Sequence, residues 1–518
     1  MPGLFYGKKS SSLNPDRGIR DLLKPAACVI ILVLALMSLF YLNLTLYMSS
    51  SSDGGVVEEF LTGSSPQLPT EDSSRLPNPS LPSKSTSTST SSSSPTPFTK
   101  MHLMFSTDCT PYQNWQSYLL FHSALRVSQP GDVTRVVSGC SPEQQSSMSA
   151  WHETYVSGSM SRHFHVHFTP TFDKTDSGSE YKFFNKPFGL LHWLENGIGL
   201  DPVTGKLKPE DATTIFAVLD PDMVLIKPLV NDFSSPTEHR WTVPKRQPRP
   251  TRVTDGRPVA QVYGLGSKWT TFPLASITGN PSTPALSVGA QAASDLYAAG
   301  PPFLLSGRDM LDVAVGWAAF VKPVNEIYPT LLGEMYAFCV AAADRNLPFD
   351  LASSFMVSAL DAEELEAFPL LSDADVRRHC DGSLDTSTAK GQQQLEGEVP
   401  FVLHYCQNYR VGQFAFHKGH VPHDVFTCDA PLMIEPDGNV VDQLYKTQGP
   451  SPVDGSRRPN VQYTKDQARN AAFMLCGVLR GINEAATFFK DKHCGDKGGG
   501  NRSKEWSQLA KEAKSYKG

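Results

Sequence analysis

The sequence predicts an α/β domain with a mainly parallel central sheet, preceded by one transmembrane helix and a disordered stalk. Between residues 101 and 219, apolar runs of strand length alternate with segments whose apolar positions recur at helical spacing, which is typical of a mainly parallel sheet. Residues 25–48 carry no charge, and about twenty apolar residues span a bilayer as a helix. Residues 49–98 are rich in Ser, Thr and Pro, a composition that cannot bury a core.

The apolar run has the charge pattern of a signal anchor with a cytoplasmic N-terminus. Basic residues outnumber acidic ones before it, and the first charges after it are acidic. The positive-inside rule therefore predicts a cytoplasmic tail at residues 1–24, a membrane span at 25–48 and a lumenal remainder. A cleaved signal peptide is the alternative, but its apolar core is shorter and ends at small residues. This layout is common among Golgi transferases, so we expect a single-pass type II protein of the Golgi or ER membrane.

The cysteines that follow the apolar run favour disulfides. They are Cys109, Cys140, Cys339, Cys380, Cys406, Cys428, Cys476 and Cys494. No two form a Cys-x-x-Cys pair, which argues against zinc ribbons and redox motifs. We expect at least two disulfides in an oxidising compartment, with the pairing left open; the alternative is that some cysteines are simply buried small residues. The net charge of −6 gives no indication of a nucleic-acid partner.

The chain after the stalk divides into three expected units. A main domain is expected at residues 99–455, a C-terminal helical segment at 456–495 and a basic, flexible tail at 496–518. Expected strands lie at residues 101–107, 134–138, 163–168 and 213–219. Expected helices lie at residues 112–127, at 185–195 with Pro187 in the first turn, and at 464–489 with Thr464 as N-cap.

A metal site is expected at the end of the strand at 213–219. Ligands of open α/β sheets bind beyond the carboxyl ends of the strands, and Asp220, Pro221 and Asp222 follow this strand directly. Carboxylates at positions i and i+2 of an extended backbone point to the same side, and they repel each other unless a cation lies between them. Mg²⁺ or Mn²⁺ is often held by one or two carboxylates together with substrate phosphates. The alternative is an ordinary strand-ending turn.

Six segments, taken in order, resemble one protein family. They are FSTDCTPYQNWQS, FNKPFGLLHWLE, FAVLDPDMVLIKPL, GPPFLLSGRDM, GEMYAFCVAAA and FVLHYCQNYRVG, within residues 101–420. The family comprises the plant and algal hydroxyproline O-arabinosyltransferases and the related peptidyl serine α-galactosyltransferases. The resemblance implies a GT-A-like nucleotide-sugar-binding domain, a UDP-sugar donor and a divalent cation, Mn²⁺ or Mg²⁺. The family's metal motif commonly reads Glu-Pro-Asp, where this chain has Asp220-Pro221-Asp222.

The function implied by this resemblance is transfer of a sugar to secreted or cell-wall glycoproteins rich in hydroxyproline or serine. The N-terminal anchor favours the arabinosyltransferases, so arabinofuranose and hydroxyproline are the expected sugar and acceptor. Transfer of galactose to serine is the alternative. A non-catalytic lumenal binding or scaffold protein is a second alternative, from a different functional class.

The resemblance and the expected strand ends also imply roles for single residues. Asp220 and Asp222 are expected metal ligands, and GT-A enzymes often add a late histidine, here His404, as a third ligand; His404 is otherwise a core histidine. Asp222 and Glu334 are the expected catalytic residues. Glu334 would act as general base or orient the acceptor hydroxyl, and its alternative is a first-turn carboxylate favoured by the helix dipole.

Other residues are expected to contact the donor or the acceptor. Thr107 and Asp108 end the first strand, where a nucleotide-sugar fold meets the nucleoside, although Asp108 is also a good helix cap. Lys186 opens a helix and is expected to face the diphosphate or donor sugar; it is otherwise an exposed lysine. Arg308 and Asp309 are expected either to contact the acceptor or to form an ion pair.

The remaining aromatic and histidine residues are expected to be structural. Trp115 and Trp193 are expected in the core. His417, His420 and His423 are expected in a loop, because their spacing suits no standard metal site.

Overall fold

The structure is a computed structural model. It describes residues 100–504 except 175–177, 179, 202, 234–251, 387–390, 392–393, 396, 412–413, 437–439, 441–462 and 496–502. The cytoplasmic tail, the membrane span and the stalk expected from the sequence lie outside the described residues. Of the helices that are described, none has both the length and the hydropathy needed to cross a bilayer.

A seven-stranded sheet forms the centre of the described part of the chain. Its strands, from one edge to the other, are β3 (Phe164–Thr169), β2 (Asp132–Ser138), β1 (Met101–Asp108), β4 (Ile215–Leu219), β7 (Ala299–Ser306), β6 (Val259–Val262) and β8 (Asp350–Ala352). Strands β3, β2, β1 and β4 are parallel to one another, and β6 is parallel to β8. Only β7 runs the other way, antiparallel to β4 and to β6. The expected α/β fold with a mainly parallel sheet is therefore confirmed.

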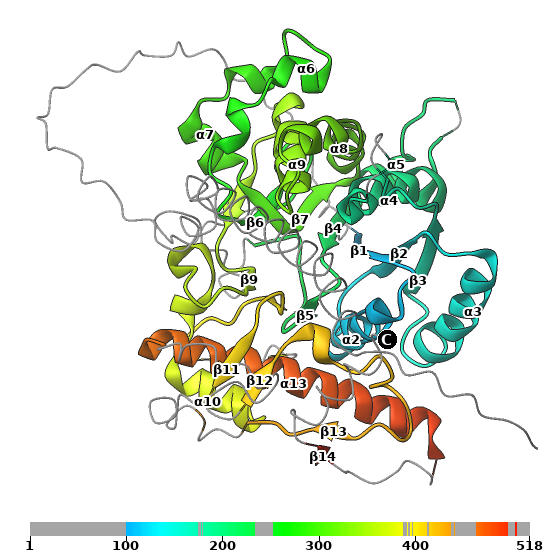
Figure 1. Cartoon of the computed structure of the whole chain (residues 1–518), viewed down its shortest axis with the longest axis vertical. Coiled ribbons are helices and arrows are strands. Elements are labelled where there is room, and N and C mark those ends of the chain that lie inside the picture. Colours follow the sequence, from blue (N-terminus) through cyan, green and yellow to red (C-terminus); the bar gives the residue numbers. More distant parts are fainter. Residues whose placement is uncertain are drawn as a thin grey trace, which may run out of the picture. The chain divides into compact units, whose positions relative to one another are not determined.

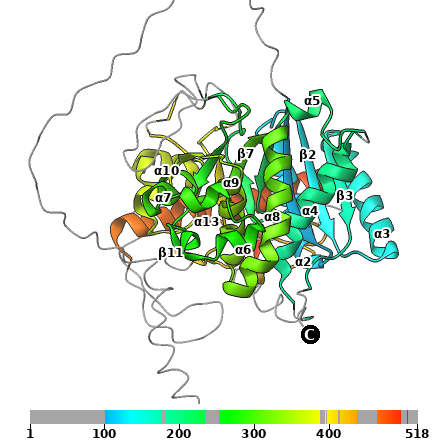
Figure 2. The same ribbon diagram turned by 90° about the horizontal axis from the view of Figure 1, so that it is seen from above.

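Helices lie on both faces of this sheet (Figure 1). The longer ones are α2 (Pro111–Arg126), α3 (Pro142–His152), α4 (Asn185–Trp193), α8 (Gly307–Ile327), α9 (Gly333–Asp344), α10 (Asp373–Asp381) and α13 (Lys465–His493). The shorter ones are α5 (Pro209–Ala212), α6 (Leu274–Thr278) and α7 (Ala290–Leu296). Figure 2 shows α4 and α8 side by side over one face.

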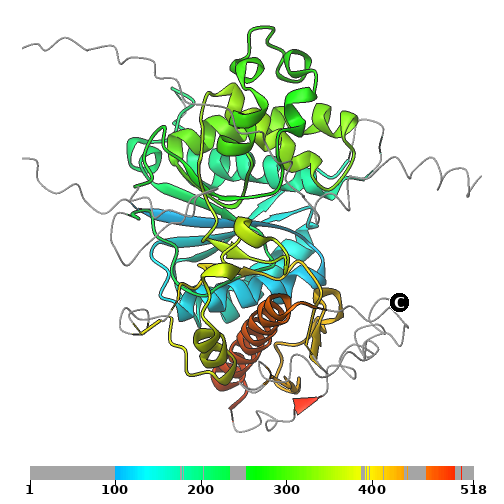
Figure 3. The same cartoon turned by 90° about the vertical axis from the view of Figure 1, so that its left-hand side faces the viewer.

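The strands contribute side chains to two separate hydrophobic cores, because successive side chains of a strand point to opposite faces of the sheet. Leu103 and Phe105 of β1 belong to the core that also contains residues of α2 and α13. Met104, between them, belongs to the core shared with α4, α8 and α9. Figure 3 shows the sheet between the green helices of the second core and the orange helix α13. Burial on both faces explains why these strands read as continuous apolar runs.

The helix boundaries follow from local sequence signals. Helix α2 begins at Pro111, where a proline at the first position leaves no helical hydrogen bond unmade. Helix α13 begins after Thr464, whose hydroxyl accepts a bond from the backbone N–H of Gln467 in a capping box. Trp115 and Trp193 are buried in the cores, as expected.

A second, three-stranded sheet extends from the central one. It contains β5 (Met223–Leu225), β10 (Val402–His404) and β9 (Met356–Val357). Strand β10 is antiparallel to β5 and parallel to β9. Two small pairs complete the strands described: β11 (Tyr409–Val411) with β12 (Phe414–Phe416), and β13 (Leu432–Met433) with β14 (Ser503–Lys504). Strand β14 is the part of the expected tail that the structure describes.

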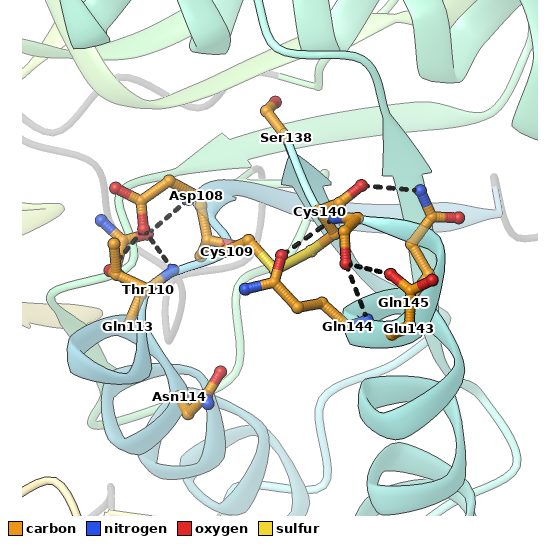
Figure 4. The surroundings of a disulfide bond; sticks show 12 residues. Asp108, Cys109, Thr110, Gln113, Asn114, Ser138, Cys140, Glu143, Gln144 and Gln145 are labelled. Carbon is orange, nitrogen blue, oxygen red and sulfur yellow. Dashed lines mark hydrogen bonds between the residues drawn. A yellow bond between two sulfur atoms is a disulfide. The ribbon is translucent and has the colours of Figure 1, made fainter.

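Three disulfides join six of the eight described cysteines and leave Cys339 and Cys406 free, which confirms the expectation of at least two. Cys109 pairs with Cys140, Cys380 with Cys476 and Cys428 with Cys494. The first bond connects the chain just beyond β1 to the chain just beyond β2 (Figure 4). The other two attach α13 to α10 and to the segment before β13, so α13 is covalently fixed to the domain on which it packs.

Removing the disulfide between Cys380 and Cys476, with both residues changed to Ala, is expected to lower the free energy of unfolding by about 2–5 kcal/mol. The bond spans a sequence separation of 96 residues, so its loss releases much conformational freedom in the unfolded chain. Denaturant titration measures the change. Cys109→Ala with Cys140→Ala is the matched control, since those residues are separated by only 31 positions. Its loss should be smaller by about 1 kcal/mol in the loop-entropy account, and a larger loss in the control would contradict that account.

Candidate functional site

Several polar side chains gather at one edge of the central sheet because most of its strands end there. Strands β1, β4 and β6 point the same way, so Asp108, Asp220 and Tyr263 lie at or just beyond their carboxyl ends. This is the edge where open α/β sheets bind ligands.

The reversal of β7 removes two expected residues from this edge. Ser306, at the end of β7, pairs with Ile215 at the start of β4. Helix α8, which follows β7, therefore begins where β4 starts and not where β4 ends. Arg308 there forms an ion pair with Asp255, and Asp309 accepts a bond from the N–H of Gly256. The ion pair expected as the alternative is therefore found for Arg308, whereas Asp309 binds a backbone N–H.

Asp220, Asp222 and His404 form a group that can hold a metal ion. One ligand atom from each residue lies within 4.8 Å of the other two. Nε2 of His404 is 3.2 Å from an oxygen of Asp222 and 3.9 Å from an oxygen of Asp220. Two carboxylates and an imidazole are ligands suited to Mn²⁺, and carboxylates suit Mg²⁺ as well.

Strand pairing brings these three residues together. Asp220 directly follows β4, Pro221 and Asp222 form a turn, and β5 begins at the next residue, Met223. Because β10 is antiparallel to β5, His404 at the end of β10 pairs with Met223. The N–H of Tyr405 then donates to the backbone carbonyl of Asp222 at 3.0 Å.

Basic groups already balance the charge of Asp222. Burial alone would raise the pKa of this carboxyl, but His404 and Lys418 hold it well below its usual range. Burial opposes the charge on His404 too, yet Cys406 and Asp222 keep the pKa of its imidazole well above the usual value. A metal ion at this site would therefore replace the imidazole proton and the ammonium group of Lys418 as the partner of Asp222.

A second ion-pair group adjoins the first through Lys186. Its Nζ is 2.7 Å from an oxygen of Asp220 and 3.5 Å from an oxygen of Glu334. Lys186 lies near the start of α4 and Glu334 near the start of α9, so two helix N-termini supply the side chains. The side chain of Lys186 is only 16% exposed, which excludes the alternative of an exposed lysine.

Glu334 is a buried carboxyl with a perturbed acidity. Burial raises its pKa to about 7, against the opposing attraction of Lys186. Its backbone is fixed on both sides: its N–H donates to the hydroxyl of Tyr181, and its carbonyl accepts from the indole N–H of Trp317. A carboxyl with a pKa near neutrality can exchange protons at physiological pH.

Thr107 and Asp108 lie at the same end of the strands, but Thr107 is bonded to the neighbouring strand β2 and Asp108 to the turn that follows β1. The hydroxyl of Thr107 accepts from Nε of the buried Arg135 and donates to the carbonyl of Val136. Oδ1 of Asp108 accepts from the N–H of Thr110 at 2.9 Å (Figure 4). Among the described residues, neither side chain forms a hydrogen bond or ion pair with the metal group.

Sequence reasoning missed Lys418 and Tyr263. Lys418 lies in the segment expected to be a loop, and its ammonium group contacts Asp222, which is 196 positions earlier. The hydroxyl of Tyr263 is 3.3 Å from Nδ1 of His404. Neither residue stands in a motif, and only the folded chain brings them to the site.

Curated relatives match part of this chain. A peptidyl serine alpha-galactosyltransferase of Arabidopsis thaliana is 24% identical over 338 residues, which cover 64% of this chain and 33% of that protein. A peptidyl serine alpha-galactosyltransferase of Chlamydomonas reinhardtii is 32% identical over 133 residues, which cover 25% of this chain and 15% of that protein. The chain is thus distantly related to these proteins and spans a third or less of their length. No known protein-family profile matches it.

Two solved structures share slight similarity with this chain. The galactosyltransferase LgtC, in complex with donor and acceptor sugar analogs, is 10% identical with a TM-score of 0.29; the match covers 59% of this chain and 87% of LgtC. The bifunctional glycosyltransferase WbbM is 8% identical with a TM-score of 0.31; the match covers 68% of this chain and 51% of WbbM. These TM-scores are too low to support an argument about fold or function.

Glu334→Gln is expected to change how stability depends on pH. The pKa of Glu334 is about 7 in the folded protein, against an ordinary value of 4.5, so the folded state binds this proton more tightly than the unfolded state. The resulting stabilisation is complete below pH 4.5 and is lost as the pH rises through 7. Denaturant titrations between about pH 5 and 8 should therefore show wild-type stability falling relative to Glu334→Gln. The exposed Glu210→Gln is the control, and curves for Glu334→Gln that stay parallel to wild type would refute the expectation.

Proposed function

We propose that this chain is a metal-dependent glycosyltransferase that moves a sugar from a UDP-sugar to a hydroxyl group of a polypeptide. The observation that carries the proposal is the group of Asp220, Asp222 and His404 beyond β4. The distant relationship to peptidyl serine alpha-galactosyltransferases supports it. In the reaction the bond from the anomeric carbon to the diphosphate oxygen breaks, the bond to the acceptor oxygen forms, and the acceptor loses a proton.

The three clustered residues would hold the metal ion. Asp220 and Asp222 supply hard oxygen ligands, and His404 supplies a nitrogen once its Nε2 is unprotonated. When bound, Mn²⁺ or Mg²⁺ supplies a Lewis acid that neutralises the charge of the leaving diphosphate. Asp222 is the carboxylate nearest to His404 and Lys418, so we place it closest to the reacting centre.

Two lysines would bind the phosphates of the donor. Lys186 and Lys418 each pair with one carboxylate of the metal group, so they hold positive charge next to the position of the ion. If Asp220 and Asp222 held a metal ion, the ammonium groups of Lys186 and Lys418 would be available to the phosphate oxygens of the donor. Fixed cations aimed at a charge that develops during the reaction are a principal source of rate enhancement.

Glu334 would orient the acceptor hydroxyl group and accept its proton. It is held 3.5 Å from Lys186, its backbone is fixed by Tyr181 and Trp317, and its pKa of about 7 suits a group that accepts a proton.

Asp108 would bind the nucleoside, with support from its place at the carboxyl end of β1. Thr107, whose hydroxyl is bonded to Arg135, would contribute by fixing the end of that strand.

Galactose and serine are the sugar and acceptor that we propose. The two curated relatives are named for that reaction, which favours it over the transfer of arabinofuranose to hydroxyproline expected from the N-terminal anchor. In our proposal both reactions would use a UDP-sugar and a polypeptide hydroxyl group, so the same site would serve either one.

We also propose that the domain works in the Golgi or ER lumen, anchored by residues 25–48. The three disulfides support an oxidising compartment. Protease treatment of intact and of detergent-opened vesicles tests this topology. Digestion of the domain in intact vesicles would refute it.

Asp220→Asn and Asp222→Asn are each expected to lower the rate of transfer by about 100-fold or more, because each removes one negatively charged ligand from the ion that stabilises the leaving group. Initial rates across a Mn²⁺ titration measure the effect. Asp295→Asn, an exposed carboxylate on α7, is the matched control and should keep wild-type activity. Wild-type rates in both site variants would eliminate the metal site.

A donor and acceptor screen tests the function itself. The full-length chain, with Mn²⁺, is incubated with UDP-galactose or UDP-arabinofuranose and with peptides that contain serine or hydroxyproline. We expect galactose on serine peptides. Arabinose on hydroxyproline would replace that reaction with its alternative, and transfer from neither donor, despite measurable Mn²⁺ binding, would favour a non-catalytic binding protein.

A further inference from the structure

Tyr263 connects the central sheet to the metal-binding histidine. It directly follows β6, and its N–H donates to the carbonyl of Ala298 at 2.8 Å, which continues the pairing of β6 with β7. Its hydroxyl oxygen is 3.3 Å from Nδ1 of His404 and 3.3 Å from the sulfur of Met356. The imidazole therefore has its Nε2 directed at Asp222 and its Nδ1 directed at Tyr263.

The sulfur of Met356 sets the direction of the hydrogen bond to His404. A thioether has no hydrogen and can only accept, whereas a tyrosine hydroxyl has one hydrogen to donate and lone pairs to accept with. When the hydroxyl donates to Met356, its lone pair is left for an N–H at Nδ1 of His404. An imidazole that keeps its hydrogen on Nδ1 presents the Nε2 lone pair as its metal ligand atom.

Gly300 allows the tyrosine ring to reach this position. A Cβ atom on Gly300 would lie 2.0 Å from Cδ2 and 2.2 Å from Cε2 of Tyr263. Gly300 is in β7 and pairs with Gln261 of β6, so the ring lies directly against the backbone of the neighbouring strand. No residue with a side chain fits here while the ring stays in place.

We propose that Tyr263 is a positioning residue that keeps the Nδ1 hydrogen on His404 and aims Nε2 between Asp220 and Asp222. The proposal rests on the metal-dependent function proposed above and adds three residues to it: Tyr263, Met356 and Gly300. Partners that fix the orientation and tautomer of a metal-binding histidine typically contribute a factor of about 10–100 to metal affinity.

The thiol of Cys406 is a competing partner for the same imidazole. Cys406 is also among the groups that raise the pKa of the His404 imidazole, so its thiol is the alternative source of the orienting contact. Tyr263→Phe removes the phenolic oxygen and leaves Cys406 in place, while Cys406→Ala does the reverse. Comparison of the two variants therefore assigns the orienting role to one side chain.

The test measures Mn²⁺ affinity of the full-length chain by isothermal titration calorimetry, alongside unfolding of the metal-free protein. Tyr263→Phe should weaken Mn²⁺ binding by about 10–100-fold, and Gly300→Ala should weaken it as well by displacing the ring. The metal-free unfolding midpoint of Tyr263→Phe should stay close to that of Tyr118→Phe. Tyr118 is a matched control because its buried hydroxyl has no hydrogen-bond partner among the described residues.

Transfer assays separate positioning from a merely structural role. With Tyr263→Phe, the Mn²⁺ concentration for half-maximal rate should rise by the same factor as the dissociation constant, while the rate at saturating Mn²⁺ stays close to wild type. Unchanged Mn²⁺ affinity in Tyr263→Phe, or a loss in Cys406→Ala alone, would overturn the proposal. Failure of the wild-type chain to bind Mn²⁺ would instead overturn the metal-dependent function on which it rests.

Discussion

The antiparallel pairing of β5 with β10 is the contact on which the candidate site depends. Strand β5 starts directly after Asp222, and β10 ends at His404, so their pairing places a carboxylate and an imidazole side by side. The backbone bond from Tyr405 to Asp222 closes this end of the pair. Since β9 joins the other side of β10, Met356 comes within reach of Tyr263. One short sheet thus assembles ligands and supporting residues from distant parts of the chain.

Charge balance lets so many ionisable groups share a buried region. Asp220, Asp222 and Glu334 each face a basic group, which is Lys186, Lys418 or His404. Removing one partner from such a group leaves an uncompensated buried charge, which is strongly destabilising. In the proposed reaction a divalent ion and a diphosphate would bring charges of opposite sign, so their entry together would preserve this balance.

The direction of each strand decides which residues the site includes. The sequence places Asp220 beyond β4 and Arg308 beyond β7, and both follow apolar runs of similar appearance. An apolar run reads the same whether its strand is parallel or antiparallel to its neighbours. Because β7 is antiparallel to β4, Arg308 lies at the opposite edge and pairs with Asp255. The sequence left Arg308 with two alternatives, an acceptor contact or an ion pair, and the direction of β7 decided between them.

The sequence by itself predicted four of the strands and three of the helices, and together with the family resemblance it predicted the three residues of the metal group. The strand ending at Leu219, the capping box at Thr464 and the carboxylates Asp220 and Asp222 depend on neighbours only a few positions away, and such signals are legible in a linear chain. Only the tertiary structure decided the disulfide pairs, the reversal of β7 and the arrival of Lys418 and Tyr263 at the site. Those features depend on contacts between segments far apart in sequence, whether between backbones as in β4 and β7 or between side chains as in the disulfides, and no local pattern specifies the partner.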